Sequence, residues 1–333
     1  MCCQVLWVDF DHRSLILLYH PSMKSNQNDP RSVPILVTGG HRTGTTWVGK
    51  MLAANGQVAY ISEPLNVLHR PGVLRAKMDR WYQYICDENE SAYLTAFEEL
   101  LDYRYHQWDE IRSIRSLKDF LRMGRDFAIF YNGLMRGQRV LLKDPFAIFS
   151  IPWFAKRFNF KVVVTVRHPA AFASSLKRLG WNFDFKDLLD QPLLMRDHLE
   201  PYREQMQSIK QDDVIGQASL LWTLIYRAAD SFRNLIPDLL IVRHEDLSRD
   251  PIPGFRSLYE SLSLDFTPRV EEKIVSSSSS ENPAELLRKK VHSVKLDSRA
   301  NVDNWRKRLT EEEAHRVREM TQDVLSLYYP ESM

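Results

Sequence analysis

Residues 34–52 read PILVTGGHRTGTTWVGKML, and this stretch decides the fold. Pro34 to Thr38 is a short apolar run rich in β-branched residues, which predicts a buried strand. A glycine-bearing loop from Gly39 to Thr46 follows, and apolar residues then recur at helical spacing from Trp47 onward. The order of strand, glycine loop and helix is the unit from which parallel α/β sheets are built.

Further strands are predicted on both sides of a long helical region. Short apolar runs indicate strands at 57–62, 139–142, 161–166 and 238–242. Strands that alternate with helices imply a parallel sheet with helices on both faces. We therefore expect an α/β protein with a three-layer, P-loop-type fold, in which ligands bind beyond the carboxyl ends of the strands. Polar residues suited to chemistry follow the five strands: Arg42, Glu63, Lys143, Arg167 and His244.

The length of 333 residues allows one large domain with a sizeable core. The formal net charge is only +2, which excludes a global basic field that would attract nucleic acid or an anionic membrane. We expect a loosely attached arm over residues 1–30, with one short strand at Gln4–Val8, and a single domain over 31–333. The aromatic-rich region from about Leu74 to Met135 is predicted to be helical and to pack mainly as core, with the lining of an acceptor cleft as the alternative for part of it.

The three cysteines, Cys2, Cys3 and Cys86, have the spacing of neither a disulfide framework nor a metal site. This usage fits a reducing compartment, so we expect a cytoplasmic location. A lipid on the adjacent pair is an alternative, but no myristoylation signal accompanies it. The longest apolar run near the start, residues 15–19, is far shorter than the ~20 residues that span a bilayer.

The loop has the glycine spacing of a nucleotide phosphate loop, Gly39-x4-Gly44, but Thr45 stands where nucleotide hydrolases have lysine. That lysine reaches the β- and γ-phosphates, and the hydroxyl after it holds Mg²⁺. A loop without it can still hold one anionic group on backbone N–H groups at the start of a helix. Arg42 supplies a cation within the loop. The pattern favours a nucleotide whose single 5′ phosphate bears another group, with a plain glycine turn as the alternative.

The motif Arg42-Thr-Gly-Thr-Thr-Trp47 resembles the 5′-phosphosulfate-binding loop of sulfotransferases that use PAPS (3′-phosphoadenosine 5′-phosphosulfate). Among these enzymes, the motifs of this chain are closest to the carbohydrate and tyrosylprotein branches. The resemblance implies PAPS as cosubstrate and requires no metal. It also implies that the cosubstrate contacts Arg42, Thr43, Gly44, Thr45, Thr46 and Trp47.

Arg167 follows the valine-rich strand, and Ser175 lies eight positions later. The same enzymes place Arg and Ser at this separation, where they grip the 3′-phosphate. The guanidinium fork suits phosphate oxygens, and Ser174 is the neighbouring alternative to Ser175. The segment from His244 to Leu247 resembles a family segment whose aromatic residue lies against adenine, although His244 departs from the tyrosine found there.

Transfer of a sulfuryl group to a hydroxyl needs a base for the hydroxyl proton and cations for the departing charge. Glu63, 21 positions after Arg42, is the predicted general base, because related carbohydrate and tyrosylprotein enzymes carry a glutamate near this spacing. The segment from Lys143 to Phe146 resembles one in the tyrosylprotein enzymes whose lysine lies near the sulfonate, which implies that Lys143 stabilises the sulfonate. Arg42 is expected to lie near the bridging oxygen. Asp144 is a lesser alternative base. Pro145 stands where the cytosolic branch has its histidine base, which favours Glu63.

The C-terminal part holds two further predictions. Residues 293–305 resemble the loop that folds over the nucleotide, with Lys295 and Arg299 expected in place of the missing Arg-Lys-Gly signature. Thr310 and Glu313 fit a capping box that begins a helix over 309–328.

The sequence therefore predicts a PAPS-dependent O-sulfotransferase that acts by in-line displacement on a carbohydrate-like acceptor. A P-loop nucleotide kinase is one alternative, and it needs the missing lysine and a ligand for Mg²⁺. A non-catalytic nucleotide-binding protein is the other, and it predicts that Glu63 is dispensable.

Overall fold

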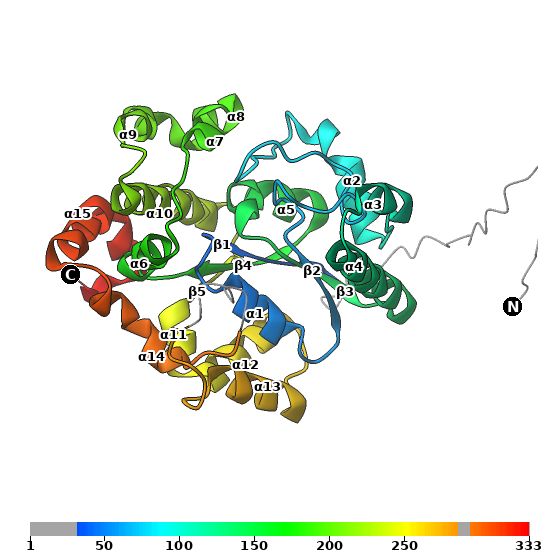
Figure 1. Ribbon diagram of the computed structural model, residues 1–333. Coiled ribbons are helices and arrows are strands. Elements are labelled where there is room, and N and C mark those ends of the chain that lie inside the picture. The colour runs from blue at the N-terminus through cyan, green and yellow to red at the C-terminus, as the bar shows by residue number, and fades with distance from the viewer. Residues whose placement is uncertain (1–31, 286–293, 333) are drawn as a thin grey trace, which may run out of the picture.

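A five-stranded parallel sheet in the order β2-β3-β1-β4-β5 forms the centre of the computed structural model, which describes residues 32–285 and 294–332 (Figure 1). The strands are β1 (Ile35–Gly39), β2 (Val58–Ser62), β3 (Arg139–Lys143), β4 (Lys161–Val166) and β5 (Leu240–Arg243). This confirms the α/β fold and all five predicted strands. The predicted arm, its strand at Gln4–Val8 and the basic residues Lys289, Lys290 and His292 lie outside the described residues.

The middle of the sheet is buried on both faces, which explains the unbroken apolar runs of its strands. β1 pairs with β4 along its whole length, from Ile35 opposite Lys161 to Gly39 opposite Thr165. A Cβ atom on Gly39 would lie 2.4 Å from the Thr165 carbonyl oxygen, and Gly39 has φ +145°. Only glycine therefore allows β1 to enter its loop this close to β4.

Helices cover both faces of the sheet (Figure 1). One face is covered by α1 (Thr45–Leu52), α11 (His244–Arg249), α12 (Pro251–Ser261), α13 (Pro268–Ser278) and α14 (Ser298–Val302). The other face is covered by α5 (Ile151–Phe158), α6 (Pro169–Leu179), α10 (Val214–Ser231) and α15 (Glu311–Tyr328). Fully buried rings such as Phe172 and Trp222 lie between the sheet and this second set of helices. Burial of each ring stabilises the fold by about 1.5–3 kcal/mol.

The region 70–135 is helical only in its second half, so the prediction was wrong for the first half. Its helices are α2 (Leu94–Leu101), α3 (Gln107–Ser113) and α4 (Leu117–Arg136). Residues 63–89 form neither helix nor strand. Their backbone groups bond to distant side chains instead: Tyr84 N–H donates to Gln191 at 2.8 Å, and Ile85 N–H donates to Ser150 at 2.9 Å. These partners replace the bonds that a local helix would supply.

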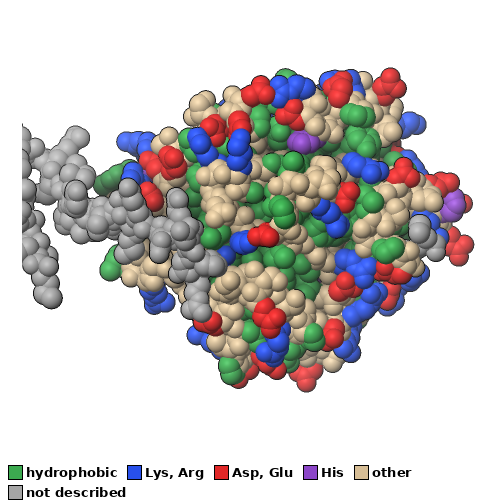
Figure 2. All heavy atoms as spheres, turned by 180° about the vertical axis from the view of Figure 1, so that it is seen from behind, with side chains coloured by type: hydrophobic (Ala, Val, Ile, Leu, Met, Phe, Trp, Pro, Cys, Tyr) green, Lys and Arg blue, Asp and Glu red, His purple; other side chains and the backbone are tan. Residues whose placement is uncertain are grey.

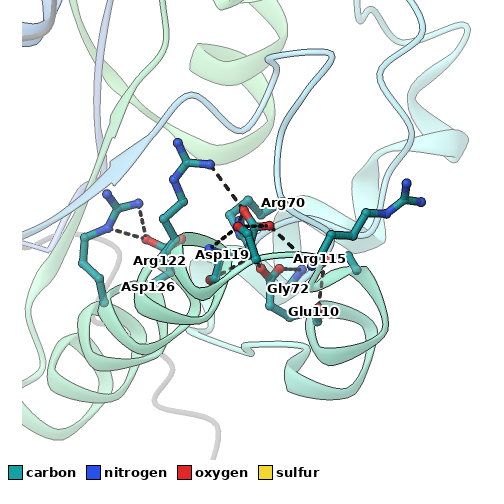
Figure 3. A network of polar contacts seen from close by, with 10 residues as sticks. Arg70, Gly72, Glu110, Arg115, Asp119, Arg122 and Asp126 are labelled. Atoms are coloured by element: carbon teal, nitrogen blue, oxygen red, sulfur yellow. Dashed lines mark hydrogen bonds and ion pairs between the residues drawn. The ribbon is translucent and has the colours of Figure 1, made fainter. Parts of the chain in front are cut away.

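A buried ionic network fastens this irregular segment to α3 and α4 (Figure 3). The carboxylate of Glu110 is fully buried, accepts from Gly72 N–H at 2.9 Å and forms an ion pair with Arg70. Arg70 also reaches Asp119 at 3.3 Å. A Cβ atom on Gly72 would lie 2.8 Å from Glu110. Because removing one partner strands a buried charge, breaking the pair costs about 3–5 kcal/mol.

Three short helices lie between α6 and α10: α7 (Lys186–Leu189), α8 (Pro192–Leu194) and α9 (Arg203–Ser208). The capping box of α15 is present, with reciprocal bonds between Thr310 and Glu313. No helix within the described ranges is long and apolar enough to cross a membrane.

Acidic and basic side chains are interspersed over the face shown in Figure 2, in keeping with the net charge of +2. A strong anion site therefore has to be local rather than a property of the whole surface.

Candidate active site

The loop between β1 and α1 turns through two left-handed residues, Arg42 at φ 68° and Gly44 at φ 98°. Arginine in this region costs about 1–3 kcal/mol, which the surrounding contacts must offset. Thr43 supplies one such contact, because its hydroxyl donates to the Gly40 carbonyl at 2.5 Å and lies 2.9 Å from the Thr165 hydroxyl. Thr43 is fully buried and supports the loop from below.

A cavity beyond the carboxyl ends of β1, β4 and β5 brings most of the predicted binding residues together. From the sequence prediction it is lined by Arg42, Gly44, Thr45, Thr46, Trp47, Arg167, Ser175 and His244. Thr43 is the one predicted cosubstrate contact that does not line it. Two more polar lining residues, Ser298 and Asn301, lie in the 293–305 segment that was predicted to fold over the nucleotide. Sequence reasoning missed the other polar lining residues, which are Arg178, Ser277, Glu285 and Arg308.

The cavity is strongly cationic. Arg167 donates from Nη1 to the Arg42 carbonyl at 3.1 Å, and its buried Nε has no hydrogen-bond partner within the described part of the chain. Arg42 Nε lies 3.4 Å from the Ser175 hydroxyl. Burial, and then the charges of Arg167 and Arg178, lower the pKa of Arg42 to about 10. Several guanidinium groups thus lie around the buried Nε–H of Arg167, and this arrangement suits a ligand with several anionic oxygens.

Arg308 and Arg178 take the places for which the sequence suggested Lys295 and Arg299. Both line the cavity and form ion pairs with Glu285, Arg308 at 2.5 Å and Arg178 at 3.6 Å. Arg299 instead donates to the Arg249 carbonyl at 2.8 Å, and Lys295 is exposed. Arg178 lies three residues after Ser175, so the two share one face of α6. That helical spacing is the signal in the sequence that could have identified Arg178.

Arg308 also lies 3.5 Å from the hydroxyl of Ser174, the neighbouring alternative to Ser175. The two serines therefore face different arginines, Ser175 with Arg42 and Ser174 with Arg308. Of the two, only Ser175 lines the cavity, in keeping with the sequence preference.

Trp47 and His244 form the aromatic side of the cavity, with ring centroids 5.8 Å apart. The indole donates to the Ser277 hydroxyl at 2.9 Å, and His244 Nδ1 lies 3.2 Å from the Ser248 hydroxyl. Burial, and then the charge of Arg167, lower the pKa of His244 to about 4, so this ring is neutral. A Cβ atom on Gly44 would lie 2.4 Å from the imidazole, which excludes any side chain there.

A buried carboxylate that sequence reasoning missed positions the turn after β4. Glu245 accepts from the His168 N–H at 3.0 Å and from the Tyr329 hydroxyl at 2.6 Å. The carbonyl of Arg167 accepts from the Trp222 indole at 2.8 Å. The backbone at Arg167 and His168 is thus held by two elements, α11 through Glu245 and α10 through Trp222.

Glu63 and Lys143 meet on the other side of β1, at the ends of the paired strands β2 and β3. Glu63 N–H donates to the Lys143 carbonyl at 2.8 Å, and the two side chains form an ion pair. Asn66 donates to the second carboxylate oxygen at 2.9 Å. The lysine side chain is 2% exposed and the glutamate side chain 23% exposed, so of the two the glutamate is the more accessible to solvent. Glu63 itself adopts φ 56°.

Asp144, the lesser alternative base, has a structural task. It is fully buried and accepts from the N–H groups of Leu65 at 2.5 Å and Phe146 at 2.9 Å. Burial, and then the charge of Glu63, raise its pKa to about 7. A carboxylate with both oxygens bound to backbone and no exposed surface shapes this turn and is poorly placed to meet an acceptor.

Aromatic side chains also lie in the turn after β3 and beside the Arg42 loop. Trp81 packs on Phe146 with centroids 4.5 Å apart, and the guanidinium of Arg42 lies 5.9 Å from the ring centroid of Trp181. Within residues 32–285 and 294–332 no cluster of three or more metal-ligating side chains occurs.

Comparison with known proteins shows the family of the chain. The profile described as "Sulfotransferase family" matches residues 34–268, which is well over half of the chain. A comparison with curated protein sequences finds no significant match.

Among solved structures, the sulfotransferase domain from the curacin biosynthetic pathway is similar at 16% identity and a TM-score of 0.45, covering 86% of this chain and 96% of its own. Sulfotransferase STF9 from Mycobacterium avium is similar at 15% identity and a TM-score of 0.44, covering 90% and 78%. Mouse sulfotransferase SULT7A1, solved with PAP, is similar at 12% identity and a TM-score of 0.43, covering 89% and 85%. On the family profile, this chain belongs to the sulfotransferase family and is a sulfotransferase enzyme.

Proposed function

We propose that this sulfotransferase transfers the sulfuryl group of PAPS to a hydroxyl of a carbohydrate-like acceptor, with Glu63 as the general base. One observation carries the proposal. The cavity of four arginines lies on one side of β1 and the Glu63–Lys143 pair on the other, with the Arg42 loop between them. This arrangement provides a place for a nucleotide with two anionic ends and a base for the acceptor.

The cavity suits PAPS in its charge and its shape. Backbone N–H groups at the start of α1, together with Arg42, would hold the 5′-phosphosulfate. Arg167, with its buried orphan Nε, and Ser175 would hold the 3′-phosphate. The space beside Trp47 and His244 would take the adenine. Arg308 and Arg178 add two cations that the nucleotide would share with Glu285.

Glu63 is proposed to accept the acceptor's hydroxyl proton as the oxygen attacks sulfur. The new bond joins that oxygen to sulfur, and the bond between sulfur and the bridging phosphate oxygen breaks. The electron pair stays on the phosphate of departing PAP, where Arg42 neutralises it. Lys143 has three N–H donors and spends one on Glu63, which leaves others for the sulfonate oxygens. The proton ends on Glu63 and passes to solvent.

The acceptor class rests on the Glu-Pro-Leu segment at residues 63–65, which resembles the Glu-Pro of some carbohydrate-sulfating enzymes, and on the aromatic rings beside Phe146 and Arg42. Flat rings such as Trp81 and Trp181 offer stacking surfaces for the apolar faces of sugar rings, and a phenol would also stack. A cytoplasmic setting remains our proposal from the cysteine usage.

Titration calorimetry with PAP, AMP and ATP-Mg²⁺, followed by transfer of ³⁵S from labelled PAPS to a panel of glycans and phenols, tests the proposal. We expect PAP to bind at least ten times more tightly than AMP, and label to appear on glycans. Tight ATP-Mg²⁺ binding with phosphate transfer would favour a kinase. Binding of PAP with no transfer to any acceptor, and no effect of Glu63→Gln, would favour a non-catalytic protein.

A further inference from the structure

We propose that His41 donates a hydrogen bond from Nε2–H to a non-bridging sulfonate oxygen during transfer, which adds a fourth group to the proposed set of Glu63, Lys143 and Arg42. This inference rests on the proposed function. His41 precedes Arg42 in the loop, and no role for it followed from the sequence. Its side chain packs among aromatic rings, stacked on Phe146 at 6.4 Å and edge-on to Phe172 at 5.5 Å.

The first step is the position of the ring. Its electrostatic neighbours are Arg42 and Glu63, the residues proposed to meet the bridging oxygen and the acceptor proton. It also contacts Trp181, whose ring centroid lies 6.3 Å away and which itself lies under the Arg42 guanidinium. His41 is thus adjacent to Arg42 in the loop and within electrostatic range of Glu63, and we place the transferring sulfonate beside its ring.

The second step is the tautomer, which Tyr82 fixes. The Tyr82 hydroxyl lies 2.7 Å from His41 Nδ1 and accepts the His41 backbone N–H at 3.3 Å. The tyrosine is fully buried, and within the described part of the chain Nδ1 is the one acceptor near its proton. A buried hydroxyl without an acceptor is costly, so the Tyr82 O–H donates to Nδ1. The ring proton is therefore on Nε2.

The third step is the charge and the free donor. Burial, and then the charge of Arg42, lower the pKa of His41 to about 4, so the ring stays neutral at physiological pH. A neutral ring whose Nδ1 already accepts a hydrogen bond cannot take the proton of the substrate hydroxyl. It has one N–H group, at Nε2, that can donate a hydrogen bond. Nε2 has no hydrogen-bond partner among residues 32–285 and 294–332, and the residue as a whole is half-buried. A donor on the attacking oxygen would weaken the nucleophile, which assigns Nε2–H to the sulfonate.

A pair of substitutions separates a donor from a merely structural contact. Gln places its amide nitrogen near the position of Nε2, whereas Asn places its amide near Nδ1 and keeps the Tyr82 contact. We expect His41→Asn to lower kcat by about 10²-fold, in the range for one lost donor, and His41→Gln to lose less than 10-fold. His41→Phe keeps the ring packing and should behave like Asn. PAP lacks the sulfonate, so its affinity should stay within twofold in all three.

The opposite order, with Asn active and Gln inactive, would overturn the proposal and leave His41 as a positioning residue for the loop. Equal activity of wild type and His41→Phe would overturn it as well. Nitrogen-15 NMR of the histidine side chains gives a readout that is independent of turnover. We expect the Nε2–H tautomer for His41 in the wild type and a mixture of the two tautomers in Tyr82→Phe. An Nδ1–H tautomer in the wild type would contradict the inference. Failure of the proposed function differs from all of these, because the wild type itself would then transfer no label.

Discussion

The two sides of β1 are built by different means. On the side of β4 and β5, the nucleotide cavity is made by the strand ends and by the helices that begin there. On the side of β2 and β3, the Glu63–Lys143 pair opens onto residues 63–89, which have no regular structure. The first side combines the local backbone geometry of the loop with long-range bonds, such as those from the His168 N–H to Glu245 and from the Trp222 indole to the Arg167 carbonyl. The second is fixed by long-range bonds, including the Arg70–Glu110 pair and the contacts of Gln191 and Ser150.

This difference indicates how one fold can keep a cosubstrate and change its acceptor. Substitutions in the irregular segment would alter the surroundings of Glu63, while the residues of that segment that contact the Arg42 loop, such as Tyr82 against His41, would have to be kept. In parallel α/β sheets, ligands bind where the order of the strands reverses. In this sheet the reversal lies at β1, between β3 and β4.

Glu63→Gln is the substitution with the largest expected effect, and it breaks the acceptor side alone. We expect kcat to fall by about 10³-fold, within the range for loss of a general base, because the amide cannot take the proton. PAP affinity by calorimetry should be unchanged. Glu98→Gln on the exposed face of α2 is the matched control and should retain wild-type turnover. Wild-type turnover in Glu63→Gln would remove this residue from the mechanism.

Lys143→Met tests whether the acceptor side also supplies a cation. We expect turnover to fall by about 10²-fold, because one preorganised charge is lost while the buried stem is kept. Lys50→Met removes an exposed lysine from the same neighbourhood and should leave turnover within a few-fold. Similar losses in both variants would indicate a general field rather than a specific contact. The measurement is the initial rate at saturating PAPS.

Arg167→Met breaks the nucleotide side. We expect PAP to bind about 10- to 100-fold more weakly, as for loss of a hydrogen bond to a charged group, with AMP binding unchanged. Arg299→Met is the control, because Arg299 contacts the Arg249 carbonyl and does not line the cavity. If the variant weakened PAP and AMP equally, the guanidinium would have no particular role at the 3′-phosphate. Calorimetry with the two nucleotides decides.

Gly44→Ala tests how tightly the backbone defines this side. A methyl group there meets both a left-handed φ and the His244 ring, so we expect PAP binding to be lost and the free energy of unfolding to fall by about 2–4 kcal/mol. Gly56→Ala has a similar φ, and its new Cβ meets no described atom within 4 Å. It should cost only about 1–2 kcal/mol. If urea unfolding showed the same loss of unfolding free energy in both variants, the His244 ring would have moved aside for the new methyl group.

The smallest expected effect is on the pH dependence of stability in mildly acidic solution. The pKa of His244 is about 4 in the fold and about 6.5 when unfolded, so the unfolded chain binds more protons between these values. The stability from this group is complete above pH 6.5 and is lost as pH falls toward 4. His244→Asn should make the slope of unfolding free energy against pH shallower in this window, by at most about 1.4 kcal/mol per unit. An unchanged slope would mean that the ring is already charged in the fold.

The same division explains what the sequence could predict. The loop from Arg42 to Trp47, the Arg167–Ser175 spacing and the residues after each strand were found because their signals are local. Arg308 and Glu245 were missed because each reaches the site through a fold contact that leaves no spacing to read. Thr43 was assigned to the cosubstrate because the motif does not reveal that its hydroxyl lies against Thr165.

The irregular segment was predicted to be helical for a related reason. Its aromatic residues suit a helix in composition, and nothing local indicates that the Tyr84 N–H would bond to Gln191, more than a hundred positions away. Lys143 and Glu63 were found singly, from the ends of their strands, and the sheet order then made them neighbours.

The tryptophans give this division an optical consequence. Trp47 lies beside the proposed adenine position, and Trp181 lies beside Arg42 and His41 on the other side. Indole emission responds to stacking and to nearby charge, so each half of the site carries its own built-in reporter. Two single Trp→Phe variants would thus let the arrival of nucleotide and of acceptor be timed separately in one stopped-flow experiment, without any attached dye.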